Sequence, residues 1–459
     1  MDKQGYVWWK ELNRYHWFVL VVAALGWLFD TMDQQLFNLA RVPAMRDLLA
    51  TAAGPASKED VAAYSGYATA IFLLGWATGG LIFGVLGDRY GRARVMLWTI
   101  LVYSLCTGLS AFATGFWDFS FYRFITGLGV GGEFAVGVAL VAEVMPDRAR
   151  PFALGWLQAL SAVGNVSAAL ISMSLARLEA TGVVGDWNIG GFQMNAWRLM
   201  FVVGTLPALL AVLIRSKLKE PDRWQHAVHD GAAKKTVGLY GELFGDPRWR
   251  HHAIVGMLMA FAGVVGLWGI GFFSFDLFDA VFRKHFEAQG LDPAGVAGKI
   301  GFWKGITSVL QNVGGFFGIY AFSRITHLIG RRPAFALSYV AAMLSTALVF
   351  WCLDEFSEIF WMIPLMGFCQ LSIFGGFAIY FPELFPTRLR STGTSFCYNV
   401  GRFVAAVGPF TFGLLTSKVF VGLPHEPMRY AGVTMCAIFL LGMAALPFAP
   451  ETRGKPLPE

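Results

Sequence analysis

The sequence predicts an all-α membrane protein with about twelve membrane-spanning helices in two related halves. Three observations support this fold class. Of the 459 residues, 56% are apolar and only 14% are Asp, Glu, Lys or Arg, whereas soluble globular proteins usually carry about 25% charged residues. The apolar residues lie in long runs, and short motifs of the first half recur in the second half. This composition excludes a disordered chain, a secreted disulfide scaffold and most soluble multidomain enzymes.

A bilayer core of about 30 Å requires about 20 apolar residues in one helix. By this measure the candidate spans of the first half are residues 17–40, 66–87, 94–114, 117–142, 151–175 and 198–214. Those of the second half are residues 252–275, 304–326, 333–353, 359–382, 391–417 and 429–449. The predicted organisation is an N-terminal segment 1–16, a bundle 17–214, a polar basic linker 215–251, a bundle 252–449 and a tail 450–459.

The positions of the basic residues predict the orientation. Of the 36 Lys and Arg residues, about 23 flank the spans on the side of the two termini and about 11 flank them on the other side. The positive-inside rule therefore places both termini in the cytoplasm. We expect a multi-pass protein of the plasma membrane, which in a bacterium is the inner membrane.

An internal repeat supports the division into two halves. The string EVMPDRAR at residues 143–150 recurs as ELFPTRLR at residues 383–390, and 383 − 143 gives an offset of 240. A Gly-Arg pair at residues 91–92 recurs at residues 330–331, where 330 − 91 gives 239. Motifs that recur at nearly one offset indicate two homologous bundles, an arrangement common in secondary transporters.

The loop after the second span has the sequence GVLGDRYGRAR, residues 84–94. It closely matches the signature loop of the major facilitator superfamily, and the chain resembles that family over nearly its full length. The resemblance implies the major facilitator fold and alternating access, with this loop latching the halves together on the cytoplasmic side. The counterpart SRITHLIGRR, residues 323–332, has His327 where the family often has an acid. We therefore expect a weaker or differently connected latch there.

The two strings at 143–150 and 383–390 resemble motifs that end spans four and ten in sugar-porter-like and metabolite–proton symporter branches. Together with the signature loop they imply intracellular gating ion pairs. The expected cytoplasmic gate residues are Asp88, Arg89, Arg92, Glu143, Arg150, Arg331, Arg332, Glu383 and Arg390.

Ionisable residues inside spans are costly and usually functional. Asp30 and Asp33 of span one are three residues apart and share a helix face. Neighbouring carboxylates beside an arginine suit reversible protonation. In related symporters an aspartate of span one pairs with an arginine of span four, and by position Asp30 and Arg123 match that pair. Alternatively, Asp33 with the following glutamines only marks the exit to the outer surface. Glu133, about 15 Å along the helix from Arg123, completes the expected proton-coupling set.

Arg402 in span eleven is the first candidate for binding an anionic substrate, because a guanidinium presents a planar fork of donors that fits a carboxylate. Asn399 and Tyr398 lie beside it in the sequence. The competing interpretation is an internal ion pair with a carboxylate such as Glu133. The other expected lining residues are Gln158, Gln311 and Asn312, although each of these is individually more typical of a helix–helix hydrogen bond.

These residues predict proton-coupled symport of a small organic anion across the bilayer, and the resemblance to the major facilitator superfamily implies a monomeric carrier. The alternatives are a neutral-sugar porter, favoured by the PDRW string at 221–224, and a non-transporting membrane sensor. An enzyme is not expected, because the chain has no HExxH, phosphate-binding loop or nucleophile motif. Basic residues punctuate apolar segments instead of forming a nucleic-acid surface. The five cysteines lie in or beside apolar stretches without CxxC, so neither a metal nor another cofactor is expected.

Overall fold

The computed structural model describes residues 7–50, 54–184, 187–229, 239–405, 411–412, 414–420 and 422–458. Parts of all five expected segments lie outside these ranges: residues 1–6 of the N-terminal segment, 51–53 and 185–186 of the first bundle, 230–238 of the linker, 406–410, 413 and 421 of the second bundle, and 459 of the tail.

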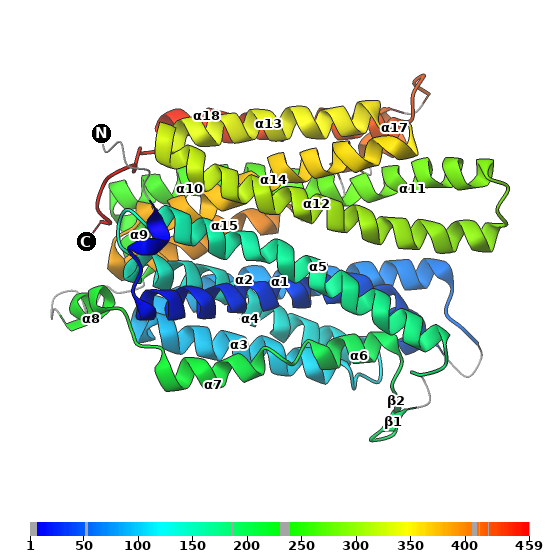
Figure 1. Ribbon diagram of the computed structural model, residues 1–459, viewed down its shortest axis with the longest axis horizontal. Helices are drawn as coiled ribbons and strands as arrows, with labels where there is room; N and C mark the ends of the chain where they lie inside the picture. The colour runs from blue at the N-terminus through cyan, green and yellow to red at the C-terminus, as the bar shows by residue number, and fades with distance from the viewer. Residues whose placement is uncertain are drawn as a thin grey trace.

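The first half is a series of long helices that run along one common axis (Figure 1). Its elements are η1 (Trp8–Lys10), α1 (Arg14–Leu48), α2 (Lys58–Tyr90), α3 (Arg92–Ser110), α4 (Phe116–Val144), α5 (Arg150–Ala180), the strands β1 (Asn188–Ile189) and β2 (Phe192–Gln193), α6 (Ala196–Val203) and α7 (Ala208–Lys217). The two strands form an antiparallel hairpin in which Asn188 is opposite Gln193.

Two short helices follow the first half, α8 (Asp222–His229) and α9 (Tyr240–Gly245). The second half contains α10 (Pro247–Val264), the π-helical stretch η3 (Val265–Ile270), α11 (Gly271–Ala288), α12 (Pro293–Ile329), α13 (Arg331–Cys352), η4 (Phe356–Glu358), α14 (Ile359–Leu384), η5 (Thr387–Leu389), α15 (Arg390–Ala405), the π-helical stretch η6 (Leu415–Val419), α17 (Pro427–Met435), α18 (Ile438–Ala445) and η7 (Leu446–Phe448).

The all-helical membrane class is confirmed. In the described part of the chain, 9 helices are long and apolar enough to cross a membrane. The other three expected spans lie in α12, in α15 with the residues after it, and in α6 with α7. The span formed by α6 and α7 is interrupted by a turn at residues 204–207. The turn ends at Pro207, which has no amide hydrogen to continue a helix. Helix α12 has 37 residues and extends well beyond the expected 304–326.

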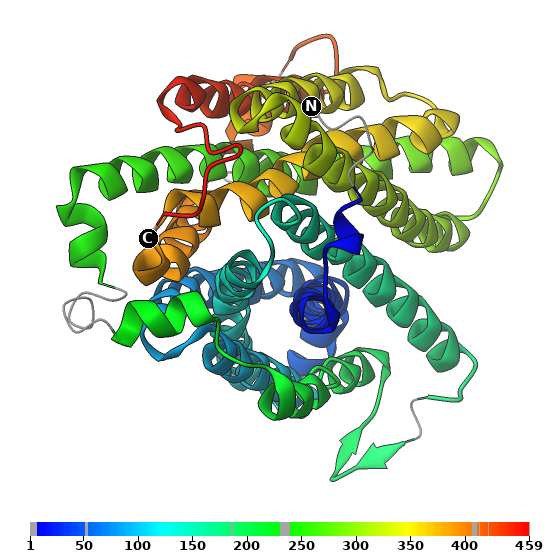
Figure 2. The ribbon, with the colours of Figure 1, turned by 60° about the vertical axis from the view of Figure 1, so that its left-hand side comes forward.

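The helices form two groups that face each other, α1–α7 on one side and α10–α18 on the other (Figures 1 and 2). We call these groups the N-bundle and the C-bundle. Both chain ends, α8 and α9 lie at one end of the molecule, which we call the terminal end. The β1–β2 hairpin and the turn between α11 and α12 lie at the opposite, distal end.

Close contact between the bundles at α2 and α15 depends on glycine. A Cβ added to Gly80 would collide with the side chain of Asn399, and one added to Gly84 would lie 2.6 Å from Cβ of Ser395. The Ser395 hydroxyl donates a hydrogen bond to the Gly80 carbonyl, so the two backbones are almost in contact. Small residues on α2 therefore set how tightly the bundles close at this level.

Candidate transport site and gate

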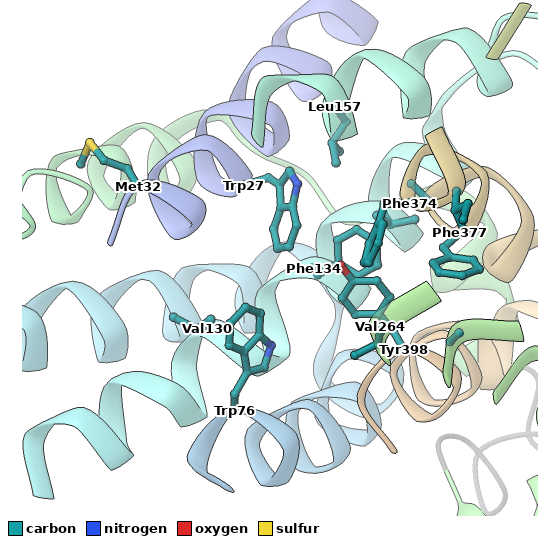
Figure 3. Close-up of a cluster of buried hydrophobic side chains, with 14 of the residues drawn as sticks. Trp27, Met32, Trp76, Val130, Phe134, Leu157, Val264, Phe374, Phe377 and Tyr398 are labelled. Atoms are coloured by element: carbon teal, nitrogen blue, oxygen red, sulfur yellow. The ribbon is translucent and has the colours of Figure 1, made fainter. Parts of the chain in front are cut away.

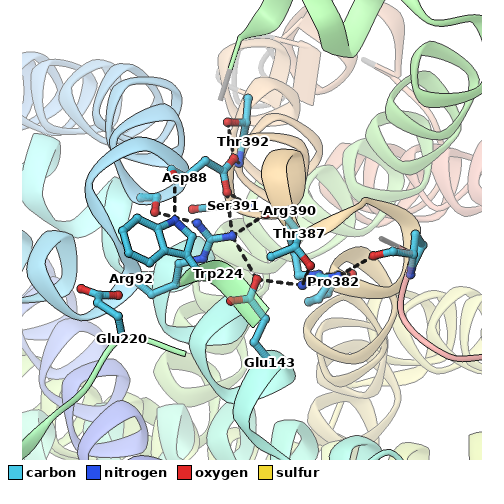
Figure 4. A network of polar contacts seen from close by, with 12 residues as sticks. Asp88, Arg92, Glu143, Glu220, Trp224, Pro382, Thr387, Arg390, Ser391 and Thr392 are labelled. Atoms are coloured by element: carbon cyan, nitrogen blue, oxygen red, sulfur yellow. Dashed lines mark hydrogen bonds and ion pairs between the residues drawn. The ribbon is translucent and has the colours of Figure 1, made fainter. Parts of the chain in front are cut away.

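A buried ion network joins the two bundles at the terminal end (Figure 4). Glu143, at the end of α4, lies 2.9 Å from Arg92 of α3 and 2.7 Å from Arg390 of α15. All three side chains are fully buried. Arg92 also donates to the Thr387 carbonyl at 2.6 Å. One carboxylate of the N-bundle thus holds an arginine from each bundle.

Asp88 of α2 adds a second connection between the bundles. It lies 2.9 Å from Arg92 and accepts hydrogen bonds from the backbone amides of Ser391 and Thr392, at 3.0 and 2.8 Å. The Thr392 hydroxyl donates to the same carboxylate at 2.6 Å. These amides belong to the first turn of α15, where the helix dipole favours negative charge. The contact therefore tethers the signature loop to the C-bundle.

The related positions of the C-bundle are connected differently. Arg331 and Glu383 form a two-pronged ion pair at 3.0 and 2.8 Å, but both residues belong to the C-bundle. His327 is the counterpart of Asp88 in the repeat. Its ring lies 5.2 Å from the ring of Phe152 in α5, whereas Asp88 accepts hydrogen bonds from backbone amides of α15. Arg150 bonds Asp147 and the Ala142 carbonyl, all in the N-bundle. The polar connection between the bundles is therefore asymmetric.

Two of the expected gate residues lie at the edge of this network. Arg89 is exposed. Arg332 is also exposed, and its guanidinium donates to the Pro447 carbonyl at 3.2 Å. The other seven expected gate residues are buried.

The segment after α7 reinforces the signature loop. The Glu220 carboxylate accepts from the backbone amides of Ala93 and Arg94, both at 3.1 Å. Trp224 donates through Nε1 to the Asp88 carbonyl at 2.6 Å. Gly91, with φ of 109°, makes the sharp turn between α2 and α3, and a Cβ there would strike the Glu220 carboxylate. Glu220 was not among the expected gate residues, although it directly precedes the PDRW string at 221–224.

Arg123 pairs with Asp33, which corrects the expected match with Asp30. Arg123 Nη1 lies 3.7 Å from Asp33 Oδ2, and the other carboxylate oxygen accepts from the Thr107 hydroxyl at 2.6 Å. Helix α1 runs from the terminal to the distal end, whereas α4 runs in the opposite direction. Asp33 is one turn nearer the distal end than Asp30, at the depth of Arg123 near the start of α4.

Asp30 and Glu133 lie deeper and have no hydrogen-bond partner in the described part of the chain. Both side chains are almost completely buried, and all four of their carboxylate oxygens are unpaired. Glu133 packs against Gly26, one turn before Asp30, where a Cβ would clash with its carboxylate. Asp30 interacts electrostatically with Glu133, Asp33 and Arg402. Burial without partners is costly for a charged carboxylate, so this position suits a neutral, protonated acid.

Tyr103 of α3 belongs to the same cluster and was not expected. Its hydroxyl is buried, has no described hydrogen-bond partner, and interacts electrostatically with Glu133, Asp30 and Asp33. No sequence signal could have identified it, because a lone tyrosine in an apolar helix is usually a packing residue.

Arg402 is also buried, and it forms no ion pair with any carboxylate in the described ranges. Its guanidinium carbon lies 3.9 Å from the ring centre of Trp76 in α2 and 4.6 Å from that of Tyr398. Its Nε is buried and unpaired. The alternative ion pair between Arg402 and Glu133 is therefore not present. Trp76, which was not among the expected site residues, forms one face of this position.

Aromatic side chains from both bundles meet next to these groups (Figure 3). Phe134 of α4 stacks on Tyr398 of α15, with ring centres 4.1 Å apart and an angle of 27° between the rings. Trp27 of α1 lies 4.7 Å from Phe134. Phe134 is the neighbour of Glu133, so the aromatic contact and the acid cluster share one level of the interface.

The amide side chains expected at the site differ in their contacts, and the Asn312 side chain joins two helices. Asn165 of α5 donates to Asn312 of α12 at 2.9 Å, which connects the two bundles. Asn399 donates to the Ser395 carbonyl at 3.1 Å, while its own side-chain oxygen is buried and unpaired. Gln158 has a buried, unpaired Oε1. Gln311 is buried, and its backbone carbonyl oxygen lies so close to Gly367 that a Cβ added there would clash with it.

Two helical bundles with a network of ion pairs at one end and buried ionisable groups between them are typical of secondary membrane transporters. A family model described as Major Facilitator Superfamily matches residues 23–409. The chain belongs to this family of secondary transporters and is not an enzyme.

Named relatives are transport proteins of similar length. A putative metabolite transport protein of Haemophilus influenzae is 29% identical, over 98% of this chain and 99% of its own. A probable 4-methylmuconolactone transporter of Cupriavidus pinatubonensis is 28% identical, over 94% of this chain and 89% of its own. A cis,cis-muconate transport protein of Acinetobacter baylyi is 28% identical, over 84% of each chain.

A solved structure has the same fold. The proton:xylose symporter XylE, bound to 6-bromo-6-deoxy-D-glucose, matches with a TM-score of 0.71 over 96% of this chain and 98% of that chain. Only 17% of the residues are identical, so the match concerns the fold alone.

Proposed function

We propose that this protein is a proton-coupled symporter of a small organic anion. The observation that carries the proposal is Arg402, a buried guanidinium between two aromatic rings with no carboxylate partner in the described chain. A buried arginine without a counter-charge is costly. A substrate carboxylate would supply that charge and fit the fork of donors.

Asp30 and Glu133 are the proposed proton carriers. Their oxygens are unpaired and buried, and Asp30 is within electrostatic reach of Arg402. Protonation neutralises the cluster and reduces the cost of closing the site around it. Arg123 and Asp33 form the neighbouring pair, and protonation of Asp33 would release Arg123.

The proposed cycle alternates between two faces of the membrane. Residues 17–214 and 252–449 act as the two moving bundles, joined by 215–251. The network around Glu143 and Asp88 closes the terminal end, which we assign to the cytoplasm from the excess of basic residues on that side. We further propose a monomer in a bacterial inner membrane. Relatives named for muconate and methylmuconolactone support an organic anion as substrate.

A thermal-shift screen of purified protein against small carboxylates and neutral sugars, at two pH values, tests the substrate class. A bound ligand raises the unfolding temperature according to its affinity. We expect a carboxylate to stabilise the protein, and more strongly at the lower pH. Counterflow in proteoliposomes with that carboxylate then establishes transport and excludes a sensor without transport activity.

Variants of the site test the roles. Arg402→Gln should abolish carboxylate counterflow, and Arg402→Lys, which keeps the charge but loses the planar fork, should lose at least about tenfold. Asp30→Asn and Glu133→Gln should uncouple exchange from the proton gradient. Undiminished proton-driven uptake in both acid variants would refute the proton assignment.

A neutral-sugar porter is the second candidate, because the PDRW segment makes gate contacts through Trp224. The two functions differ at Arg402, since a neutral sugar gives a buried arginine no counter-charge. Sugar transport that survives Arg402→Gln, without any carboxylate response, would favour the porter.

A further inference from the structure

Most buried or half-buried arginines of the described chain have a carboxylate within ion-pair distance. Three do not: Arg41, Arg324 and Arg402. Arg324 uses Nε and Nη2 on the Tyr320 hydroxyl, at 3.1 and 2.8 Å, so its donor fork is occupied. Arg402 belongs to the substrate position described above. Arg41 remains without an assigned role.

Arg41 lies in the distal part of α1, and one edge of its guanidinium is held in place. Nη1 donates to the Thr69 hydroxyl of α2 at 2.8 Å. That hydroxyl donates in turn to the Ser65 carbonyl at 2.8 Å, which fixes its oxygen as an acceptor for Arg41. Nε is buried without a partner. Since Nη2 also has no hydrogen bond within the described residues, the Nε–Nη2 edge that binds carboxylates two-pronged is free.

Arg41 and Arg402 contact the same face of α2. Arg41 contacts Thr69 and Arg402 contacts Trp76. Seven residues are almost two full helical turns, so these two contact points share one face and lie about 10 Å apart along the axis. Arg41 is on the distal side of Arg402, opposite the gate at Glu143. These two guanidinium groups, which lack a carboxylate partner among the described residues, therefore form a series from the distal end to the middle of the molecule.

We propose that Arg41 is an outer binding position for the anionic substrate, which docks there before it reaches Arg402. The proposal rests on the proposed transport of organic anions. The ligand chemistry is a carboxylate, held by Nε and Nη2 while Thr69 orients the group. Arg41 then governs capture from the distal side, whereas Arg402 governs binding at the centre.

Counterflow in proteoliposomes tests this proposal, with benzoate, succinate and cis,cis-muconate as probes. Arg41→Gln should raise the KM of the transported probe about tenfold and leave the maximal rate within about twofold, because the central position is intact. Arg41→Lys should recover part of the lost affinity. The matched control is Arg46→Gln, which removes the same charge from an exposed position of the same helix and should change neither value.

The outcomes separate the two proposals. A wild-type protein that exchanges none of the probes overturns both. Exchange by the wild type with an unchanged KM in Arg41→Gln, or a lower maximal rate with the same KM, overturns only the outer site. A lipid phosphate could also occupy the free guanidinium edge, so vesicles of phosphatidylcholine alone are compared with vesicles that contain phosphatidylglycerol. A KM effect that appears only with the anionic lipid assigns Arg41 to the lipid and overturns the proposal.

Discussion

Glu143 of the N-bundle lies 2.7 Å from Arg390 of the C-bundle, and both side chains are fully buried. The same carboxylate oxygen is 2.9 Å from Arg92. The related acid Glu383 pairs with Arg331 inside the C-bundle at 2.8 Å. Two acids from one repeated motif therefore have different roles: Glu143 connects the bundles, and Glu383 stabilises one of them.

This difference gives a matched pair of variants. Glu143→Gln leaves the buried Arg390 without its carboxylate partner, whereas Arg92 keeps Asp88. Loss of one partner of a buried pair typically costs about 3–5 kcal/mol, and we expect this cost to weaken the contact between the bundles at the terminal end. We expect hydrogen–deuterium exchange in residues 385–390 to increase at least about tenfold. Glu383→Gln should lower the unfolding temperature while exchange at the loop of residues 84–92 stays near that of the wild type. If Glu143→Gln and Glu383→Gln changed hydrogen–deuterium exchange equally in residues 84–92 and 385–390, the result would contradict the asymmetric connection between the bundles.

Neutralisation of Asp33 should lower the stability of the protein much more than neutralisation of Asp30. Asp33→Asn leaves Arg123 buried without a charge partner, so we expect destabilisation of about 3–5 kcal/mol. Asp30→Asn removes a buried carboxylate that has no hydrogen bond, so stability should change by less than about 1 kcal/mol or increase. Thermal unfolding of the two purified variants measures the difference. A larger loss in Asp30→Asn would restore the family-based match of Asp30 with Arg123.

Gly80 should control closure between α2 and α15. In Gly80→Ala the new methyl group meets the Asn399 side chain, and overpacking of this kind typically costs about 1–3 kcal/mol. We expect slower counterflow and faster hydrogen exchange at the first turn of α15. Gly137→Ala is the control, because a Cβ there meets nothing within 4 Å. The same phenotype in both variants would show that added volume alone is responsible.

We expect the contact between Glu220 and the signature loop to depend on pH. Burial raises the pKa of the Glu220 carboxyl above its ordinary value of 4.5, although the amides of Ala93 and Arg94 partly oppose the shift. An acid whose pKa is higher in the folded than in the unfolded state stabilises the fold when it is protonated. Its contribution is therefore present at low pH and is lost as the pH rises through the raised pKa. Above pH 4.5 the unfolding temperature of the wild type should fall relative to Glu220→Gln.

The control for this pH dependence is Asp222→Asn, which removes a nearby exposed acid. It should follow the wild-type profile. A constant difference between the wild type and Glu220→Gln at all pH values would contradict the role of Glu220 ionisation.

The sequence by itself determined the membrane class, most of the spans and several residues of the buried ion network that joins the bundles. Long apolar runs and motif spacing are local features, and a helix of about 20 apolar residues has few other stable environments. Asp88, Glu143 and Arg390 were identifiable because they lie in the signature loop and in the motif that recurs in both halves, which resemble those of a known family. The sequence could not show that Asp88 binds the first turn of α15, because 303 residues separate Asp88 from Ser391.

The tertiary structure decided the pairing. Asp30 and Asp33 share one face of a helix, so their spacing does not decide which of them pairs with Arg123. The antiparallel course of α1 and α4 places Asp33 at the depth of Arg123, and it places Glu133 next to Gly26. Trp76, Tyr103 and Arg41 join the proposed site only through neighbours on other helices. Which charge is paired depends on depth and rotation between helices, and these are fixed by packing across the whole bundle and not by local sequence.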